Sequence, residues 1–266
     1  MTVMTRELKA SYAFVARNWH LTKRYWGWEA AFLVYAVAGA LSITLIGKDQ
    51  GDDRLLFYLM IGAIFWNYLS VLFQILAEQI AWERWEGTLE YTMMAPVRRV
   101  SQLLGSTFYA VVYGLVHTAV ILVTLALFFG LDLSRADFAT AGLFMLLGSL
   151  SFIGIGMMAA ILPLIYVERG AQMTFVLQSL LLLISGVYYS IEVLPDWMQT
   201  LSRLSPATYV LDGVRRGLID GAAPASQFHN VWPLVAMAVV LIPLGVWMFG
   251  RAERYAKRTG KLKRVG

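Results

Sequence analysis

The sequence predicts an all-α integral membrane protein with six transmembrane helices. Hydrophobic residues make up 59% of the 266 residues and charged residues only 15%, whereas soluble domains carry roughly 25% charged residues. The mean hydropathy is +0.62. Six runs are apolar enough, and long enough, to meet the requirement of about 20 residues per span. They occupy most of the chain, so we expect a single transmembrane domain over residues 1–266.

The six predicted spans follow one another with short polar connections. They cover residues 27–46, 55–77, 100–131, 138–167, 171–191 and 231–250. The third and fourth are about 30 residues long, so they must tilt, bend or project beyond the hydrocarbon. Pro163 and four glycines in the fourth run predict a bend there.

Lysine and arginine are distributed unevenly between the two sides of the predicted bundle. The N-terminal segment, the loop after span two, the turn after span four and the C-terminal tail hold 16 of the 22 basic residues. Because cytoplasmic loops are enriched in these residues, we place these segments and both termini in the cytoplasm. We expect a multi-pass protein of a bacterial-type plasma (inner) membrane. This topology explains the net charge of +5, so no nucleic acid partner is expected.

The segment before the first span predicts a helix that lies in the membrane interface. Within residues 1–26, Leu8, Tyr12, Val15 and Trp19 recur at three- and four-residue spacing, with basic residues between them. This pattern is typical of an amphipathic interfacial helix. A basic, disordered leader is the alternative. The basic tail, residues 251–266, is expected to lie near anionic lipid on the cytoplasmic side.

The external segment 192–230 contains two short helical patterns. The first covers residues 196–204. The second runs from Ser205-Pro206, a typical helix start with Ser as cap and Pro at the first position, to Asp220. Both are too short to span the membrane. They form either a re-entrant hairpin that dips into the outer leaflet or a cap on the surface.

A polar segment between spans two and three predicts a further short helix. Thr88 is a candidate N-cap, Glu90 falls in the first turn, and Pro96 is a stop signal. The helix has about two turns and is too short to be stable alone. It therefore needs a surface to dock against.

The chain lacks the usual motifs of an enzyme. A phosphate-binding loop G-x-x-x-x-G-K-[ST] is absent, so we expect no ATP hydrolysis by this chain. The sequence has no cysteine, no G-x-S-G motif and no histidine cluster with metal-ligand spacing. We therefore predict no catalytic residue and no metal ligand. His117, in the third span, is interpreted as a polar contact between helices.

The energy source is expected to lie outside the chain. Ion-coupled transporters place ionisable groups near the membrane midplane. Here Glu29, Glu78 and Glu168 fall at span ends, near the cytoplasmic face. An ion-coupled secondary transporter is therefore a remote alternative.

The segment 83–96 resembles the coupling region of ABC exporter permeases of the second type. In that family an acidic residue, then Glu-Gly-Thr-Leu-Glu and a closing proline, follow the second span. Here these are Glu83, Glu86-Gly87-Thr88-Leu89-Glu90 and Pro96. The late external segment is also similar, through Ser185-Gly186-Val187-Tyr188-Tyr189, Leu194-Pro195-Asp196-Trp197, Ser205-Pro206 and Asp212-Gly213-Val214-Arg215. The resemblance covers essentially the whole chain.

The resemblance implies a permease that pairs with a separate ATPase subunit, as two copies of each chain. A homodimer is the simplest arrangement, and a heterodimer with a related permease is the alternative. ATP and Mg would be bound by the partner, and no cofactor by this chain. Leu89 and Met93 would offer an apolar knob, while acidic residues meet basic residues of the ATPase. The residues expected at this contact are Glu83, Arg84, Glu86, Gly87, Thr88, Leu89, Glu90, Met93 and Pro96, with Glu168 and Arg169 as a second contact.

The substrate is expected to be an amphiphile, such as a drug or antibiotic. Lipid-linked polysaccharide or teichoic-acid precursors are the alternative. Aromatic side chains in the spans suit such molecules, although they also serve ordinary packing. The candidate path residues are Phe65, Trp66, Phe73, Tyr109, Tyr113, Tyr188 and Tyr189. The candidate external gate consists of Leu194, Pro195, Trp197 and Pro206.

Overall fold

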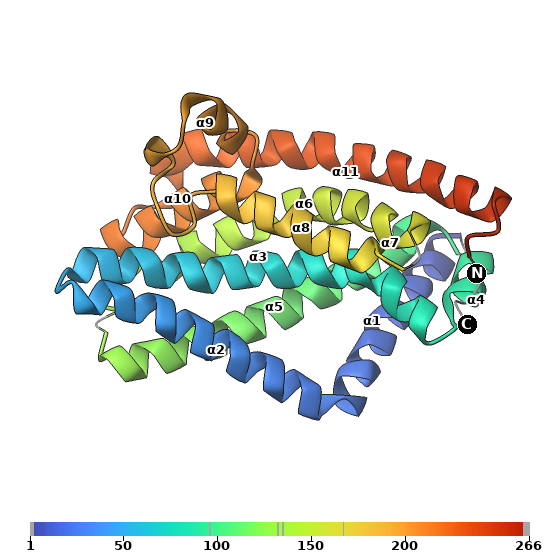
Figure 1. Cartoon of the computed structure of the whole chain (residues 1–266), viewed down its shortest axis with the longest axis horizontal. Coiled ribbons are helices and arrows are strands. Elements are labelled where there is room, and N and C mark those ends of the chain that lie inside the picture. Colours follow the sequence, from blue (N-terminus) through green and yellow to red (C-terminus); the bar gives the residue numbers. More distant parts are fainter. Residues whose placement is uncertain (1–2, 96, 132, 135, 167, 263–266) are drawn as a thin grey trace.

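The computed structural model describes residues 3–95, 97–131, 133–134, 136–166 and 168–262, and its regular elements in these ranges are all helices. The long helices are α1 (Val3–Arg24), α2 (Trp26–Asp49), α3 (Asp53–Trp85), α5 (Arg99–Phe129), α6 (Phe138–Ala159) and α11 (Phe228–Arg258). The shorter ones are α4 (Leu89–Met94), α7 (Ile161–Ile165), α8 (Gly170–Ile184), α9 (Asp196–Ser202) and α10 (Pro206–Asp220), with 3-10 turns η1 (Ile191–Val193) and η2 (Pro224–Gln227). The N- and C-terminal ends lie at the same end of the bundle as α4 (Figure 1).

Five of the predicted spans are helices long and apolar enough to cross a membrane. The remaining one, predicted over residues 171–191, is the 15-residue helix α8. At 1.5 Å per residue α8 is about 22 Å long, which is shorter than the roughly 30 Å hydrocarbon core. It ends early because Gly186 adopts a φ of +65°, a conformation that turns the chain after a helix. The apolar residues that follow belong to a turn rather than to the span.

The predicted bend in the fourth span is confirmed. Helix α6 ends at Ala159, and α7 starts at Ile161. Pro163 has no N–H to donate, and its ring would clash with the carbonyl four residues earlier, which is that of Ala159. The proline therefore separates α7 from α6 and redirects the chain towards α8.

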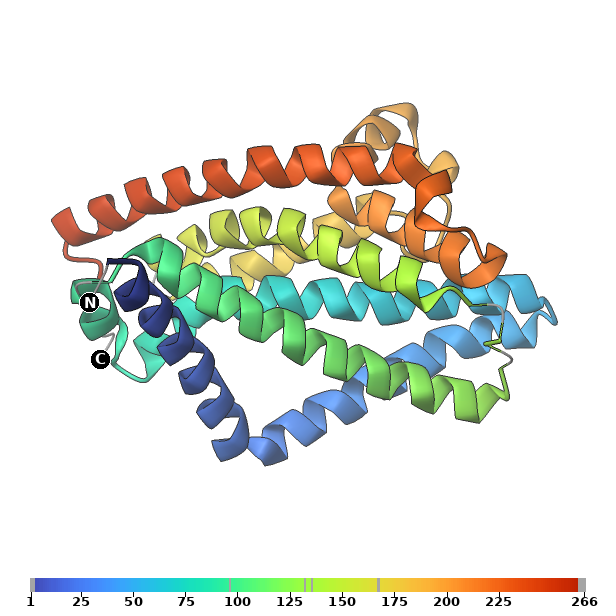
Figure 2. The same cartoon turned by 180° about the vertical axis from the view of Figure 1, so that it is seen from behind.

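Helix α1 is the predicted N-terminal amphipathic helix, and its apolar side faces away from the bundle. Leu8, Tyr12 and Trp19 are exposed, as expected for a helix whose apolar side meets lipid. The other side packs on α5, where Gly105 allows the backbone of Ser11 to approach; a Cβ at Gly105 would lie 2.3 Å from the Ser11 carbonyl oxygen. Figure 2 shows α1 meeting α2 at an elbow below α5.

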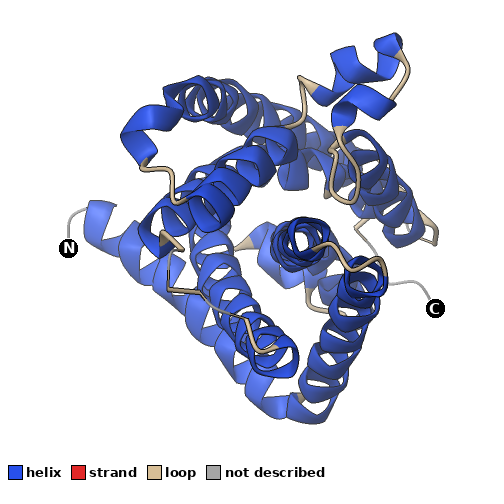
Figure 3. Ribbon diagram, turned by 90° about the vertical axis from the view of Figure 1, so that its left-hand side faces the viewer, coloured by secondary structure: helices blue, strands red, loops and turns tan. Residues whose placement is uncertain are grey.

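Helix α10 packs along α6 inside the bundle. Its contacts with α6 recur once per turn, pairing Gly217 with Thr140, Gly213 with Phe144 and Val210 with Gly148. The two helices are antiparallel over eight residues of α6, or about 12 Å. The start of α10 therefore lies deep in the bundle. This packing favours the re-entrant hairpin over the surface cap. Figure 3 views the bundle from the end opposite the termini.

The start of α10 differs in detail from the prediction. Ser205 makes no side-chain cap hydrogen bond. Its hydroxyl instead lies 2.8 Å from that of Ser185, at the end of α8. Helix α9 lies outside this junction; Trp197 of α9 and Leu204 just after it are exposed. The serine that was predicted to cap α10 therefore joins it to α8.

Arg215 of α10 holds the turn after α8 against α3. Its guanidinium donates to the carbonyl of Gly186 at 3.0 Å and to that of Val187 at 2.5 Å. It also stacks over the ring of Tyr58, at 3.4 Å from the ring centroid. Gly62 of α3 permits the close approach of the Val187 carbonyl, since a Cβ on Gly62 would lie 2.1 Å from the carbonyl oxygen.

We expect Gly62→Ala to destabilise the protein by about 1–3 kcal/mol, because the added methyl overpacks the contact with the Val187 carbonyl. Chemical denaturation in detergent micelles measures this loss. Gly142→Ala is the matched control, since a Cβ there meets nothing within 4 Å. The control should leave the stability unchanged or raise it slightly. Equal effects of the two substitutions would contradict the role assigned to Gly62.

Candidate functional site

The loop after α3 begins with a tight turn that aims α4 across the end of the bundle. Gly87 has a φ of +73°, its N–H donates to the Arg84 carbonyl, and the Thr88 N–H donates to the Glu83 carbonyl at 2.8 Å. This pair of bonds is a Schellman motif, which needs a left-handed residue such as glycine. The predicted short helix follows as α4.

The ends of α4 are only partly those predicted. Thr88 precedes the helix but makes no side-chain cap hydrogen bond. Its hydroxyl donates instead to the Glu83 carbonyl at 3.3 Å. Ala95 is the C-cap, and Pro96, the predicted stop, lies outside the described residues.

Glu83 and Arg84 face into the protein rather than towards a partner. The Glu83 side chain is 0% exposed; its Oε1 accepts from Arg17 Nη1 of α1 at 2.7 Å and from Gln79 at 3.1 Å. Arg84 donates to the carbonyls of Leu164 at 3.2 Å and Lys261 at 2.8 Å. The expectation that these two residues contact the ATPase directly is therefore wrong, because buried charges need partners within the fold.

The predicted apolar knob on α4 is also wrong. Leu89 and Met93 are each only 1% exposed. They pack in a cluster with Ile80, Ala160, Leu164, Phe249, Ala252 and Ala256. The four-residue spacing correctly indicated one apolar face. That face is covered by α3, α7 and α11 of the same chain.

The opposite face of α4 is open, and the sequence analysis identified only Glu90 on it, missing Tyr91 and Met94. Tyr91 is 80% exposed and Met94 is 79% exposed, and Glu90 beside them is exposed as well. Trp85, just before the turn, is 68% exposed. Tyr91 and Met94, on the polar side of a short helix, were the sequence signal for this surface. Large apolar side chains exposed to solvent often mark interaction sites.

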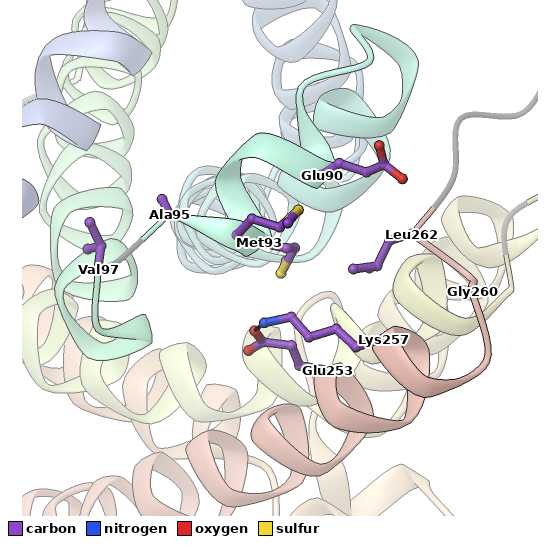
Figure 4. A pocket seen from close by; sticks show the side chains of 9 residues that line it. Glu90, Met93, Ala95, Val97, Glu253, Lys257, Gly260 and Leu262 are labelled. Carbon is purple, nitrogen blue, oxygen red and sulfur yellow. Dashed lines mark ion pairs between the residues drawn. The ribbon is translucent and has the colours of Figure 1, made fainter.

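A pocket of about 650 Å³ lies beside this surface (Figure 4). Residues of α4 and the loop after it line one side, and residues of the C-terminal end of α11 and the tail line the other. The lining residues are Glu90, Met93, Met94, Ala95, Val97, Glu253, Lys257, Gly260 and Leu262. Within the pocket Lys257 and Glu253 form an ion pair at 2.7 Å.

Helix α1 binds residues on both sides of α4 in the sequence. Arg17 binds Glu83 before α4, and Glu7 binds residues after it. The Ser101 hydroxyl donates to Glu7 at 2.6 Å, and Arg98 lies 3.8 Å away. The hydrogen bond from Ser101 lowers the pKa of the Glu7 carboxyl, and Arg98 lowers it further. Glu7 therefore stays ionised at neutral pH, and its interactions with Ser101 and Arg98 are maintained.

The remaining coupling residues lie at the surface. Glu86 is partly exposed, and Glu168 and Arg169 are exposed in the turn between α7 and α8. Their contact with an ATPase stays a prediction. Within the described part of the chain, no group of three or more His, Cys, Asp or Glu residues could hold a metal.

The predicted aromatic path is not a single lining surface. Phe65, Trp66, Phe73 and Tyr109 are buried among helices of this chain, which corrects their assignment to an open path. Phe65, Trp66 and Phe73 lie on α3, which packs against α2, α5, α6, α8 and α10, and Tyr109 lies on α5, which packs against α1 and α3. Tyr113, Tyr188 and Tyr189 are partly exposed.

The candidate gate residues fall in two places. Leu194, Pro195 and Trp197 lie on the outer loop and α9, whereas Pro206 is buried at the start of α10. Arg215, which clamps the turn after α8, was quoted in the sequence motif but not recognised as a contact. Its position four residues after the apolar Leu211, on the same face of the helix, was the available signal.

We expect Arg17→Met and Glu83→Gln each to lower the free energy of unfolding by about 1–3 kcal/mol, because each leaves a charged or polar group without its partner. The double variant should lose less than the sum of the two, since both partners are then absent. Denaturation in detergent micelles measures all three. Arg6→Met is the control, because the Arg6 side chain is 67% exposed. Additive losses would show that the two residues do not interact.

Comparison with known proteins identifies the family. The family model described as ABC-2 type transporter matches residues 9–219. Inner membrane transport permease YadH of Escherichia coli (strain K12) is 25% identical over 223 residues, covering 84% of this chain and 86% of YadH. Putative transport permease YvfS of Bacillus subtilis (strain 168) is 24% identical, over 74% of this chain and 78% of YvfS. Probable multidrug ABC transporter permease YbhR of Escherichia coli (strain K12) is 25% identical, over 65% of this chain and 46% of YbhR. This chain therefore belongs to the ABC-2 type transporter family and is a membrane permease subunit of an ABC transporter.

Proposed function

We propose that this chain forms the membrane path of an ATP-driven exporter, which moves an amphiphilic molecule out of the cytoplasm or the inner leaflet. A separate ATPase subunit binds ATP and Mg and docks on α4. The observation that carries this proposal is the two-sided character of α4. Its inner face is fixed to the bundle through Leu89 and Met93, and its outer face leaves Tyr91 and Met94 open.

This arrangement would transmit a movement of the ATPase into the membrane. The apolar cluster under α4 joins it to α7 and α11, and Arg84 joins the base of the turn to α7 and the tail. A force on the outer face of α4 would therefore shift the ends of α3, α7 and α11 together. Packed elements of this kind move as rigid bodies between discrete arrangements.

The assembly that fits one α4 per chain contains two permease copies and two ATPase copies. A homodimer is the simplest case, and a heterodimer with a related permease is the alternative. The name of YbhR, a probable multidrug ABC transporter permease, supports a drug or antibiotic as the substrate. Lipid-linked polysaccharide or teichoic-acid precursors are the second candidate.

We expect Tyr91→Ala to weaken binding of the partner ATPase roughly 30-fold, because a central aromatic anchor is worth about 2 kcal/mol in an interface. The paired reversal Glu86→Lys with Glu90→Lys should reduce substrate-stimulated ATPase activity and transport at least as strongly. Binding measurements on purified subunits, and flux in proteoliposomes, test the two expectations. Thermal unfolding of the permease alone should not change in either variant.

Leu89→Ala is the matched control on the inner face of the same helix. We expect it to destabilise the permease by about 2–5 kcal/mol, because it empties a buried site. Full ATPase binding and transport by both outer-face variants would refute the assigned docking surface. Transport driven by an ion gradient without any ATPase would refute the proposed function itself.

A further inference from the structure

A narrow polar stripe runs along α3 inside the membrane-spanning part of the helix. Asn67, Ser70, Gln74 and Glu78 follow one another at spacings of three, four and four residues, which places them on one face of a helix. Helix α8 lies alongside α3 (Figure 1), and Gln178 of α8 faces the stripe. Gln74 Nε2 donates to Gln178 Oε1 at 3.3 Å.

Several polar atoms of this stripe have no hydrogen-bond partner among the described residues. They are Asn67 Oδ1, Ser70 Oγ and Glu78 Oε1, all of them shielded from solvent. In hydrocarbon each such atom costs several kcal/mol. The membrane-embedded stripe therefore needs water or a bound polar molecule to satisfy it.

The stripe covers the half of the membrane nearest the coupling region. From Asn67 to Glu78 it rises about 16 Å, or roughly half of the 30 Å hydrocarbon core. Glu78 lies five residues before Glu83, at the end that carries α4. Asn67 lies five residues after Gly62, where the Val187 carbonyl of the re-entrant segment packs. Along the axis of α3, the stripe thus extends from near α4 to within five residues of the level at which Val187 packs.

This face carries one acidic side chain and no basic one. Residues 65–82 of α3 and all of α8 contain no lysine or arginine, and Glu78 is their only charged side chain. Phosphate and pyrophosphate groups are held in proteins by arginine, lysine or clustered N–H donors. A carboxylate among amide side chains instead suits a cation that also carries hydrogen-bonding groups.

We infer that the face formed by Asn67, Ser70, Gln74, Glu78 and Gln178 binds the cationic head of an amphiphilic substrate, namely a protonated amine or a quaternary ammonium group. Glu78 pairs with the positive charge, and the amide side chains bind polar substituents. This inference rests on the proposed function and selects among its substrates. It favours cationic drugs or antibiotics over lipid-linked pyrophosphate precursors.

The absence of native cysteine allows a direct test of accessibility in the complete transporter. Single variants Asn67→Cys, Gln74→Cys and Glu78→Cys are treated with a water-soluble methanethiosulfonate reagent in membranes. We expect all three to react, and dodecyltrimethylammonium to slow the reaction of Asn67→Cys and Gln74→Cys at least tenfold; Glu78→Cys, which lacks the binding carboxylate, should be protected less. Phe73→Cys, at a side chain only 1% exposed, is the unreactive control. Disulfide cross-links between two permease copies at these positions, without protection by the cation, would show instead that the face joins the copies and would overturn the inference.

The charge preference is tested with two amphiphiles that share one tail. Stimulation of ATPase activity in the reconstituted transporter is compared for dodecyltrimethylammonium and dodecyl phosphate. The cation should stimulate at a concentration at least tenfold lower. Glu78→Gln should remove about tenfold of this difference, which corresponds to about 1.4 kcal/mol. Glu192→Gln, at an exposed external site, is the control and should change nothing.

The outcomes separate the inference from the proposed function. Preference for dodecyl phosphate, or an unchanged cation response in Glu78→Gln, would overturn the cationic site while leaving an ATP-driven exporter in place. If no amphiphile of either charge is moved in an ATP-dependent way, the proposed function fails together with this inference. The comparison of the two amphiphiles on the unaltered protein needs no variant, so it stands even if Glu78→Gln does not fold.

Discussion

The structure depends most on the ion pair and hydrogen bonds made by two buried charged side chains at the end of α3. Glu83 and Arg84 are both nearly fully buried, and each is costly there unless it is paired. Glu83 binds Arg17 of α1, and Arg84 binds the carbonyls of α7 and the C-terminal tail. Segments from four parts of the chain therefore meet at one turn, and α4 leaves that turn.

This meeting point explains how a six-residue helix is held. A helix of this length has little stability of its own. The Schellman turn at Gly87 fixes its direction, and burial of Leu89 and Met93 fixes which side faces inward. The remaining side carries Tyr91, Met94 and Glu90 as a surface that is rigid before any partner binds. Such preorganisation lowers the ordering cost of association.

Close packing at glycine residues organises much of the opposite end of the bundle. Helix α8 stops short, and α10 takes the space beside α6 through the glycine contacts of Gly148, Gly213 and Gly217. Arg215 then ties the turn after α8 to α3. The polar stripe on α3, with its shielded polar atoms, lies between these two ends along the axis of the same helix.

The sequence by itself determined the helical class, the positions of five long apolar helices, the bend at Pro163, the short helix after Gly87 and the two helices between residues 196 and 220. Hydropathy, proline and glycine act locally, so these features can be inferred without tertiary contacts. Only the tertiary structure decided that α8 is short and that Leu89, Met93, Glu83 and Arg84 point inward. It likewise decided that the aromatic residues of α3 are core. A helical face identifies which residues lie together, but which neighbour covers that face depends on segments far apart in the chain.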